Sequence, residues 1–237
     1  MPCLFDGDYH DHVWGTSVRD SKMLFAQLSL ATQQCGVSWR IVWDKRHFYA
    51  EAFHDWDMHR VAAMTQTDLA RLVDKSGPWA GKVIQNAAKL SAIVHNAREC
   101  LRIEEEHAGG LCGFLWSFVD NCEETVNTSS LCHGDNYSRI FGVTSSYSDA
   151  LAKAMRKSAT SKYNFKFLGS ITLQAFLLQN GLLNGHSSQC HRNPRCKHRA
   201  LSSESVGPTT PVVKRVRERS VSLQTEFSSR TRRRLQR

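Results

Sequence analysis

Histidine and cysteine side chains that could bind a metal occur at two places far apart in the sequence. His10 lies in the segment Tyr-His-Asp-His-Val-Trp-Gly at residues 9–15, and His186 is followed four positions later by Cys190. Imidazole nitrogens and thiolates are the ligands that structural zinc sites take in a tetrahedral arrangement. If one ion binds both sets, it joins the first and last elements of a single domain.

Spacing alone favours a plainer interpretation. The chain has 11 His and 8 Cys, so chance pairs are common. A surface histidine and a buried thiol would then explain His186 and Cys190, and His10 would be a half-buried, hydrogen-bonded residue. The metal site therefore needs support from the rest of the chain.

The basic residues gather in one segment. Residues 197–237 hold 11 of the 31 Lys and Arg but only 3 of the 22 Asp and Glu, which leaves residues 1–196 nearly neutral. This segment mixes Ser, Thr and Pro with Arg and offers no apolar stripe to bury, so we expect a disordered basic tail. Residues 1–196 are long enough to form one domain with its own core.

The composition also bears on the class of protein. No run of about 18 apolar residues occurs, and the first residues lack the pattern of a secretory signal. The cysteines are scattered, which fits free thiols and one or two metal ligands better than disulfides. We expect a soluble, intracellular monomer without membrane contact, located in the nucleus if the source is eukaryotic and otherwise in the cytoplasm.

Apolar residues recur at helical spacing through most of the domain, which predicts an all-α fold. Asp20 or Ser21 can cap a first helix that Gly36 ends. No segment alternates as a strand would, and residues 120–147 are the least regular part. Further helices are expected from Ser38 through Phe53, at residues 58–64 and 68–73, over the long range 82–102, and at residues 148–156 and 171–179.

Several motifs, in order along the chain, resemble the DNA-3-methyladenine glycosylase I family. They are YHDHVWG at 9–15, DSKMLFAQLSLATQQCGVSW at 20–39, DKRHFYAEAFHDWDMHRVAAM at 44–64, LWSFV at 115–119, SDALAKAM at 148–155, FKFLGS at 165–170 and GLLNGH at 181–186. The resemblance implies a helix-hairpin-helix glycosylase domain with a zinc ion. It also implies excision of 3-methyladenine from double-stranded DNA, by hydrolysis of the N-glycosidic bond, in base-excision repair.

The resemblance assigns the zinc ligands by motif. His10, His186 and Cys190 match three of them, and Cys3 is the candidate for the fourth. Only six residues separate Cys3 from His10, about half the usual number in the family. His191, Cys196, His12 or water are therefore alternatives for the fourth position.

The same motifs assign the base pocket. Trp39 matches the tryptophan that stacks on the extruded base, and Tyr9 matches a tyrosine whose hydroxyl lies at the pocket. A 3-methylated adenine is cationic, and an aromatic face attracts a delocalised cation more than a neutral base. Without the motif, core packing would be the simpler role for Trp39, and Tyr9 would be a buried tyrosine that bonds to the main chain.

Ala31 stands where the family has a glutamate that hydrogen-bonds the base edge. A methyl group makes no hydrogen bond, so base discrimination should fall by a few kcal/mol. Gln174 and Leu178 also stand where the family commonly has an aromatic residue and a glutamine. The alternative function is therefore that of a relative that binds DNA or damaged base without excision. A third possible function, if the pocket is closed, is that of a structural zinc scaffold that acts through its tail.

The contacts with DNA are also implied by the resemblance. Gln34 and Val37 match a loop that fills the gap left in the duplex. The helix-hairpin-helix element should lie at residues 72–98, with Gly77, Gly81 and Lys82 in its turn near the DNA phosphate. Arginine clusters in the basic tail could add sequence-independent attraction to phosphate or direct nuclear import.

Overall fold

The fold of residues 1–196 is helical wherever the structure describes it. The structure is a computed structural model that describes residues 7–119, 144–158, 161–186 and 190–193. All of them belong to the first of the two units into which the chain divides, Met1–Cys196 and Lys197–Arg237. Within these ranges the β-structure is limited to an isolated bridge between Ser158 and Ser161. The prediction of an all-α domain is confirmed for this part of the chain.

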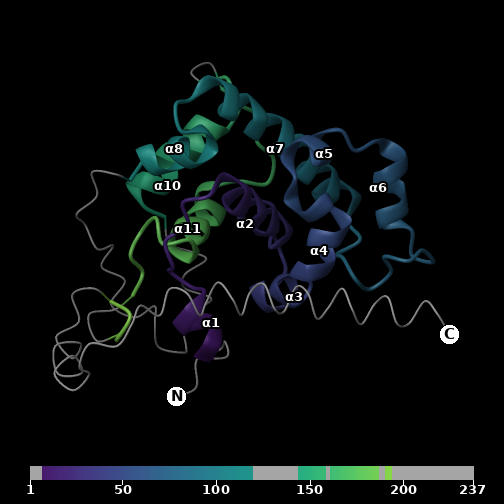
Figure 1. Ribbon diagram of the computed structural model, residues 1–237, viewed down its shortest axis with the longest axis horizontal. Coiled ribbons are helices and arrows are strands. Elements are labelled where there is room, and N and C mark those ends of the chain that lie inside the picture. The colour runs from purple at the N-terminus through teal and green to yellow at the C-terminus, as the bar shows by residue number, and fades with distance from the viewer. Residues whose placement is uncertain (1–6, 120–143, 159–160, 187–189, 194–237) are drawn as a thin grey trace, which may run out of the picture. The chain divides into compact units, whose positions relative to one another are not determined.

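Figure 1 shows the helices in chain order. None of those in the described ranges is long and apolar enough to cross a membrane. The basic tail, and all but the last residues of the irregular segment at 120–147, lie outside the described residues. The elements are α1 (Gly7–His12), α2 (Ser21–Gln33), α3 (Trp39–Asp44), α4 (Arg46–Ala52), the 3-10 helix η1 (His54–Trp56), α5 (Met58–Ala62), α6 (Gln66–Val73), α7 (Ala87–Glu106), α8 (Gly110–Ser117), α10 (Ser146–Met155) and α11 (Ser170–Gln179).

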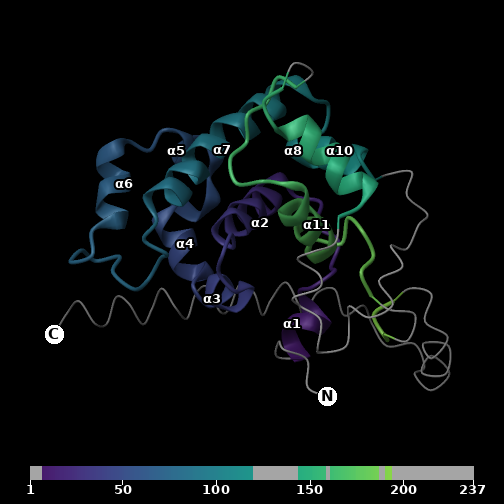
Figure 2. The same cartoon turned by 180° about the vertical axis from the view of Figure 1, so that it is seen from behind.

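Helix α2 is the central element of the domain. Its first turn is capped by Asp20, whose carboxylate accepts a hydrogen bond from the Met23 amide at 2.7 Å. Gly36 lies just beyond its end with a φ of 73°, a conformation that glycine adopts without strain. Leu24 and Leu28 are buried, and the helix packs against α7, α8 and α11 (Figures 1 and 2). The predicted helix and both of its boundary signals are confirmed.

Two predicted helix boundaries were wrong. The stripe from Ser38 to Phe53 is divided between α3 and α4, because the Lys45 amide bonds to the Val42 carbonyl in a tight turn between them. The long helix begins at Ala87 rather than at residue 82. The Asn86 side chain caps it. Val83 is buried in the preceding turn, so its apolar side chain continues the spacing of the helix although it lies outside the helix.

Two α-helices, and the short 3-10 helix η1, were not predicted. Helix α1 is only six residues long and polar. Helix α8 is apolar over most of its length and preceded by glycine, so it shows no one-sided stripe. Both lie beside segments that are distant in sequence, and packing rather than local pattern explains them.

The main chain after α1 runs directly against the end of α11. The Gly15 amide donates to the Gln179 carbonyl at 2.9 Å, and the Val18 amide donates to the Asn180 carbonyl at 3.1 Å. Gly181 has a φ of 65°, and a Cβ atom there would lie 2.7 Å from the Gly15 oxygen and the Ser17 nitrogen. Only glycine permits this approach, which places the first motif beside the last one.

We expect Gly181→Ala to destabilise the domain by about 3 kcal/mol or more, because left-handed strain and a backbone clash add together. Gly81→Ala is the matched control. Gly81 has a φ of 72° but nothing within 4 Å of its Cβ position, so it should lose only about 1 kcal/mol. Chemical unfolding followed by circular dichroism measures both. Equal losses in the two variants would show that the approach of the segments does not depend on Gly181.

Candidate functional site

The two distant sets of metal-binding side chains meet in the structure. The Cys190 Sγ atom lies 3.5 Å from His10 Nε2 and 3.4 Å from His186 Nδ1, and the His10 and His186 rings are perpendicular. A tetrahedral zinc ion, with bonds of about 2.1 Å to nitrogen and about 2.3 Å to sulfur, holds those atoms about 3.6 Å apart. The three side chains therefore have the chemistry and the spacing of zinc ligands.

Asp11 fixes the orientation of His10. Its Oδ1 atom lies 2.8 Å from His10 Nδ1 and 3.1 Å from His191 Nε2. The hydrogen bond from His10 lowers the pKa of Asp11, which keeps this carboxylate ionised. An ionised carboxylate on Nδ1 favours the tautomer that leaves Nε2 free to face Cys190, as is common for histidines that bind metals.

His186 is held as a neutral imidazole. Burial, followed by the neighbouring His10, lowers its pKa to about 4. Its carbonyl accepts a hydrogen bond from the Asn193 side chain at 2.6 Å, which holds residues 190–193 close to His186. Gly15 has no side chain, which gives the His186 ring room. A neutral buried imidazole can bind a metal without first losing a proton.

Among the described residues, no fourth candidate ligand joins His10, His186 and Cys190. Cys3 and Cys196 are outside the described residues, and His12 belongs to neither group of candidate metal-binding side chains. His191 belongs to a second group, with His10 and Asp11. The His191 ring meets the His10 ring edge-on with 5.8 Å between centroids, but His191 is not grouped with His186 and Cys190.

Tyr9 and Trp39 form one buried unit. The Trp39 indole nitrogen donates to the Tyr9 hydroxyl at 2.8 Å, and the Trp43 ring meets Tyr9 edge-on with 4.8 Å between centroids. Burial raises the pKa of Tyr9, so its hydroxyl stays neutral. Trp39 has 0% of its surface exposed. The two residues assigned to the base pocket are together, but the indole offers no open face in this arrangement.

The end of α2 carries the other assigned residues. Ala31 is buried, and so is Gln34, whereas Val37 is partly exposed in the loop that follows. The side-chain amide nitrogens of Gln34 and Gln174 and the Ser29 hydroxyl are buried with no hydrogen-bond partner among the described residues. Val37 rather than Gln34 is thus accessible at the tip of this loop.

The hairpin between α6 and α7 is closed by a side chain. Gln85 donates from Nε2 to the Leu72 carbonyl at 3.3 Å and to the Asp74 carbonyl at 2.7 Å. Gln85 therefore holds the turn together. An arginine at this position could instead extend away from the turn. Gly81 is exposed within this turn, and Lys82 lies over the Trp79 ring.

Comparisons with known proteins show which family the chain belongs to. The family model for methyladenine glycosylase matches residues 5–193. The chain belongs to the methyladenine glycosylase family.

Two curated members of this family illustrate the similarity. The DNA-3-methyladenine glycosylase 1 of Escherichia coli (strain K12) is 36% identical over 182 residues, which cover 77% of this chain and 88% of that protein. The DNA-3-methyladenine glycosylase of Haemophilus influenzae is 36% identical over 188 residues, which cover 77% of this chain and 89% of that protein.

Solved structures of family members have the same fold. A crystal structure of 3-methyladenine DNA glycosylase I matches with a TM-score of 0.68 and 34% identity, covering 82% of this chain and 100% of that one. The Staphylococcus aureus enzyme, described with its recognition of 3-methyladenine, matches with a TM-score of 0.64 and 35% identity, over 77% and 88% of the chains. The helical glycosylase-like fold is thereby confirmed.

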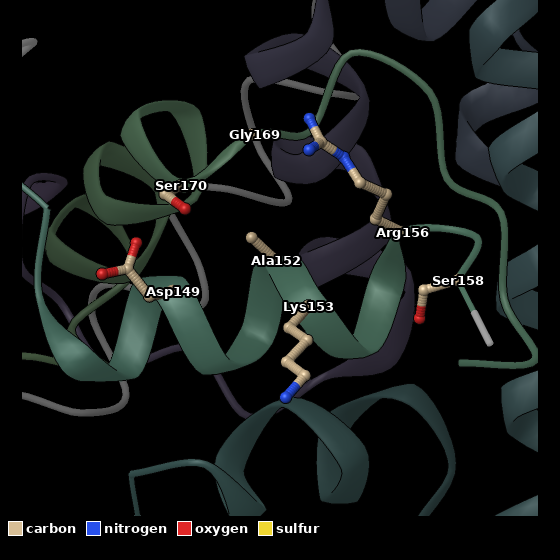
Figure 3. Close-up of a pocket in the computed structure, with 7 residues that line it drawn as sticks. All are labelled: Asp149, Ala152, Lys153, Arg156, Ser158, Gly169 and Ser170. Atoms are coloured by element: carbon tan, nitrogen blue, oxygen red, sulfur yellow. The ribbon is translucent and has the colours of Figure 1, made fainter. Parts of the chain in front are cut away.

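A separate pocket lies between α10 and the start of α11 in this glycosylase-family domain (Figure 3). It encloses about 260 Å³, and the Arg156 side chain points toward Gly169 while Lys153 points away. None of its lining residues was assigned to the base or to the metal. This pocket is thus distinct from the Tyr9 and Trp39 unit.

Lys89 was missed by the sequence analysis. It is only 7% exposed, and its ammonium group bonds to main-chain oxygens at the end of α2. A signal was present, because Ile93, Cys100 and Ile103 follow it at helical spacing on a second buried row of α7. A lysine that begins an apolar row is a candidate for a buried role.

We expect Tyr9→Phe to lower the free energy of unfolding by about 1–3 kcal/mol, because the Trp39 indole nitrogen loses its buried acceptor. In a Trp39→Phe background that donor is gone, so the same change should cost about 1 kcal/mol less. Urea unfolding of the four proteins in this double-mutant cycle gives both values. Additive losses would mean that the two side chains do not stabilise each other.

Proposed function

We propose that this protein is a DNA glycosylase that excises 3-methyladenine from double-stranded DNA by hydrolysing the N-glycosidic bond, as a step of base-excision repair. One observation carries the proposal. The chain is 36% identical to a DNA-3-methyladenine glycosylase over 88% of that enzyme's length, so most of the enzyme is represented.

The chemistry asked of this protein is mainly extrusion and binding. The positive charge of 3-methyladenine already weakens its bond to the sugar, and water completes the cleavage once the nucleotide is held outside the duplex. In the proposal, the Trp39 ring stacks on the cationic base and the Tyr9 hydroxyl contacts its edge. The Trp39–Tyr9 hydrogen bond supports a fixed angle between the two groups.

The burial of Trp39 adds a condition to this proposal. The ring has no exposed surface, and Tyr9 and Trp43 lie against it. A base can stack on the indole only if at least one neighbour moves aside when the nucleotide enters. Opening of the pocket is therefore part of the proposed binding step.

The duplex would be held by two segments. Gln34 and Val37 would support the gap from the loop after α2, with Val37 the first to meet the bases because it is already partly exposed. Gly77, Gly81 and Lys82 would meet the phosphate backbone at the hairpin. The free amide groups at the start of α7 add a partial positive charge there.

A zinc ion held by His10, His186 and Cys190 completes the proposal, with Cys3 as fourth ligand. The support is the fit of the sulfur-to-nitrogen distances to tetrahedral zinc. When bound, the ion would supply a structural cross-link between α1 and the turn after α11. The protein is further proposed to act as an intracellular monomer, in the nucleus if its source is eukaryotic. The roles suggested for the basic tail stay predictions.

A relative that binds without excision remains the second candidate. Ala31 and the closed indole favour it, because the family's hydrogen bond to the base edge is missing and the platform is covered. A duplex carrying 3-methyladenine would then be bound tightly and left intact.

We expect Asp11→Asn to weaken zinc binding by about 10- to 100-fold, because an amide orients His10 less strongly than a carboxylate does. Asp44→Asn is the control, since Asp44 pairs with Arg40 on the surface of α3. Competition with a chromogenic chelator measures both affinities. Equal affinities in the two variants would exclude this role for Asp11, and absence of zinc from the purified protein would exclude the metal itself.

We expect the protein to release 3-methyladenine from methylated duplex DNA, and Ala31→Glu to raise the single-turnover rate about tenfold or more, because a hydrogen bond to the base edge is restored. Chromatography of the released bases measures the rate. Ala26→Glu is the control, as it adds the same carboxylate at another buried position of α2. Binding without release by the wild type would support the second candidate instead.

A further inference from the structure

Lys89 is a buried cation whose hydrogen bonds go to the main chain. Only 7% of it is exposed, and no carboxylate of the described residues forms an ion pair with it. Its ammonium group donates to the Gln33 carbonyl at 2.9 Å and to the Cys35 carbonyl at 2.6 Å. Burying an ammonium group is costly unless its donors are satisfied, so these two bonds are what makes the position tolerable.

The two carbonyls belong to the end of α2 and the loop after it. The last carbonyls of a helix have no partner within the helix and carry its negative dipole end, where a cation is stabilising. Helix α2 has no basic residue in its own last turn. Lys89 supplies that cation from α7, which packs beside α2 (Figures 1 and 2).

The contact is reciprocal and continues into the hairpin. The Gln33 side chain donates to the Lys89 carbonyl at 3.0 Å, and its oxygen accepts from the Tyr49 hydroxyl at 3.4 Å. That hydroxyl in turn accepts from the Ile84 amide at 3.0 Å, just before α7. Gln33 and Tyr49 have no exposed surface, so water does not compete for these bonds.

This network joins the two segments that the proposed function assigns to DNA. Cys35 begins the loop that carries Val37, and Ile84 ends the hairpin turn that carries Gly81. A duplex has a fixed distance between the phosphate held at one point and the gap filled at another. The loop must therefore be fixed relative to the hairpin for both contacts to form together.

We infer that Lys89 is a positioning residue that holds the loop after α2 in register with the hairpin, so that loop insertion and phosphate contact occur on the same duplex. The inference rests on the proposed function. Its specific consequence is that Lys89 acts on extrusion of the nucleotide and not on attraction to DNA, because its ammonium group is turned away from solvent and toward the protein main chain.

The test compares Lys89→Met, which keeps most of the length of the side chain but removes its charge and donors, with Lys89→Arg, which keeps the charge and the donors. Extrusion is measured by the fluorescence of 2-aminopurine beside an abasic-site analogue. Binding is measured on an undamaged duplex. Lys22→Met is the control, because Lys22 is an exposed lysine of α2 that pairs with Asp55 on the surface.

We expect Lys89→Met to reduce the extrusion equilibrium about tenfold or more while changing the affinity for undamaged duplex less than about twofold. Lys89→Arg should recover at least part of the extrusion, and Lys22→Met should behave as the wild type. If Lys89→Met is unfolded at the assay temperature, Lys89→Gln, which keeps a donor without the charge, serves the same comparison.

Two results would overturn the inference. Equal losses in extrusion and in binding to undamaged duplex would mean that Lys89 attracts phosphate directly. Unchanged extrusion in a folded Lys89→Met protein would mean that the network positions nothing. Failure of the proposed function is separate, because it would appear as absence of 3-methyladenine release while the fluorescence signal still reports extrusion.

Discussion

The pairing of the main chain after α1 with the end of α11 is the contact on which the rest of the site depends. It needs Gly181, because a side chain there would meet the backbone of residues 15–17. Once the two segments are side by side, His10 faces His186 and Cys190, and Tyr9 reaches the Trp39 indole. A metal would strengthen this arrangement, but the hydrogen bonds between the segments already define it.

Some buried polar groups of the site have hydrogen-bond partners and others have none among the described residues. Trp39, Tyr9 and Lys89 have close partners, which is expected of polar groups removed from water. Gln34 and Gln174 each keep a buried amide nitrogen without a partner in the described part of the chain. Such groups cost free energy, and they lie at or near Ala31 and Gln174, the positions at which the resemblance predicts a departure from the family pattern.

Much of the fold could be predicted from the sequence because several signals are local. Asp20 and Gly36 bound α2 through a side-chain cap and a left-handed residue, and each acts within a few residues. The division of the stripe between α3 and α4 could not be predicted, because apolar spacing continues through the turn at Lys45. Helix α8 was missed because burial on most sides leaves no periodic pattern.

The sequence by itself determined the family, the helical class and the residue types at the candidate metal and base positions, since these follow from short motifs whose chemistry is local. Only the tertiary structure decided that His10 and Cys190 lie 3.5 Å apart, that the Trp39 ring is covered, and that Lys89 turns inward to the end of α2. These facts depend on contacts between segments distant in sequence, and no local pattern specifies which groups will meet when the chain closes on its core.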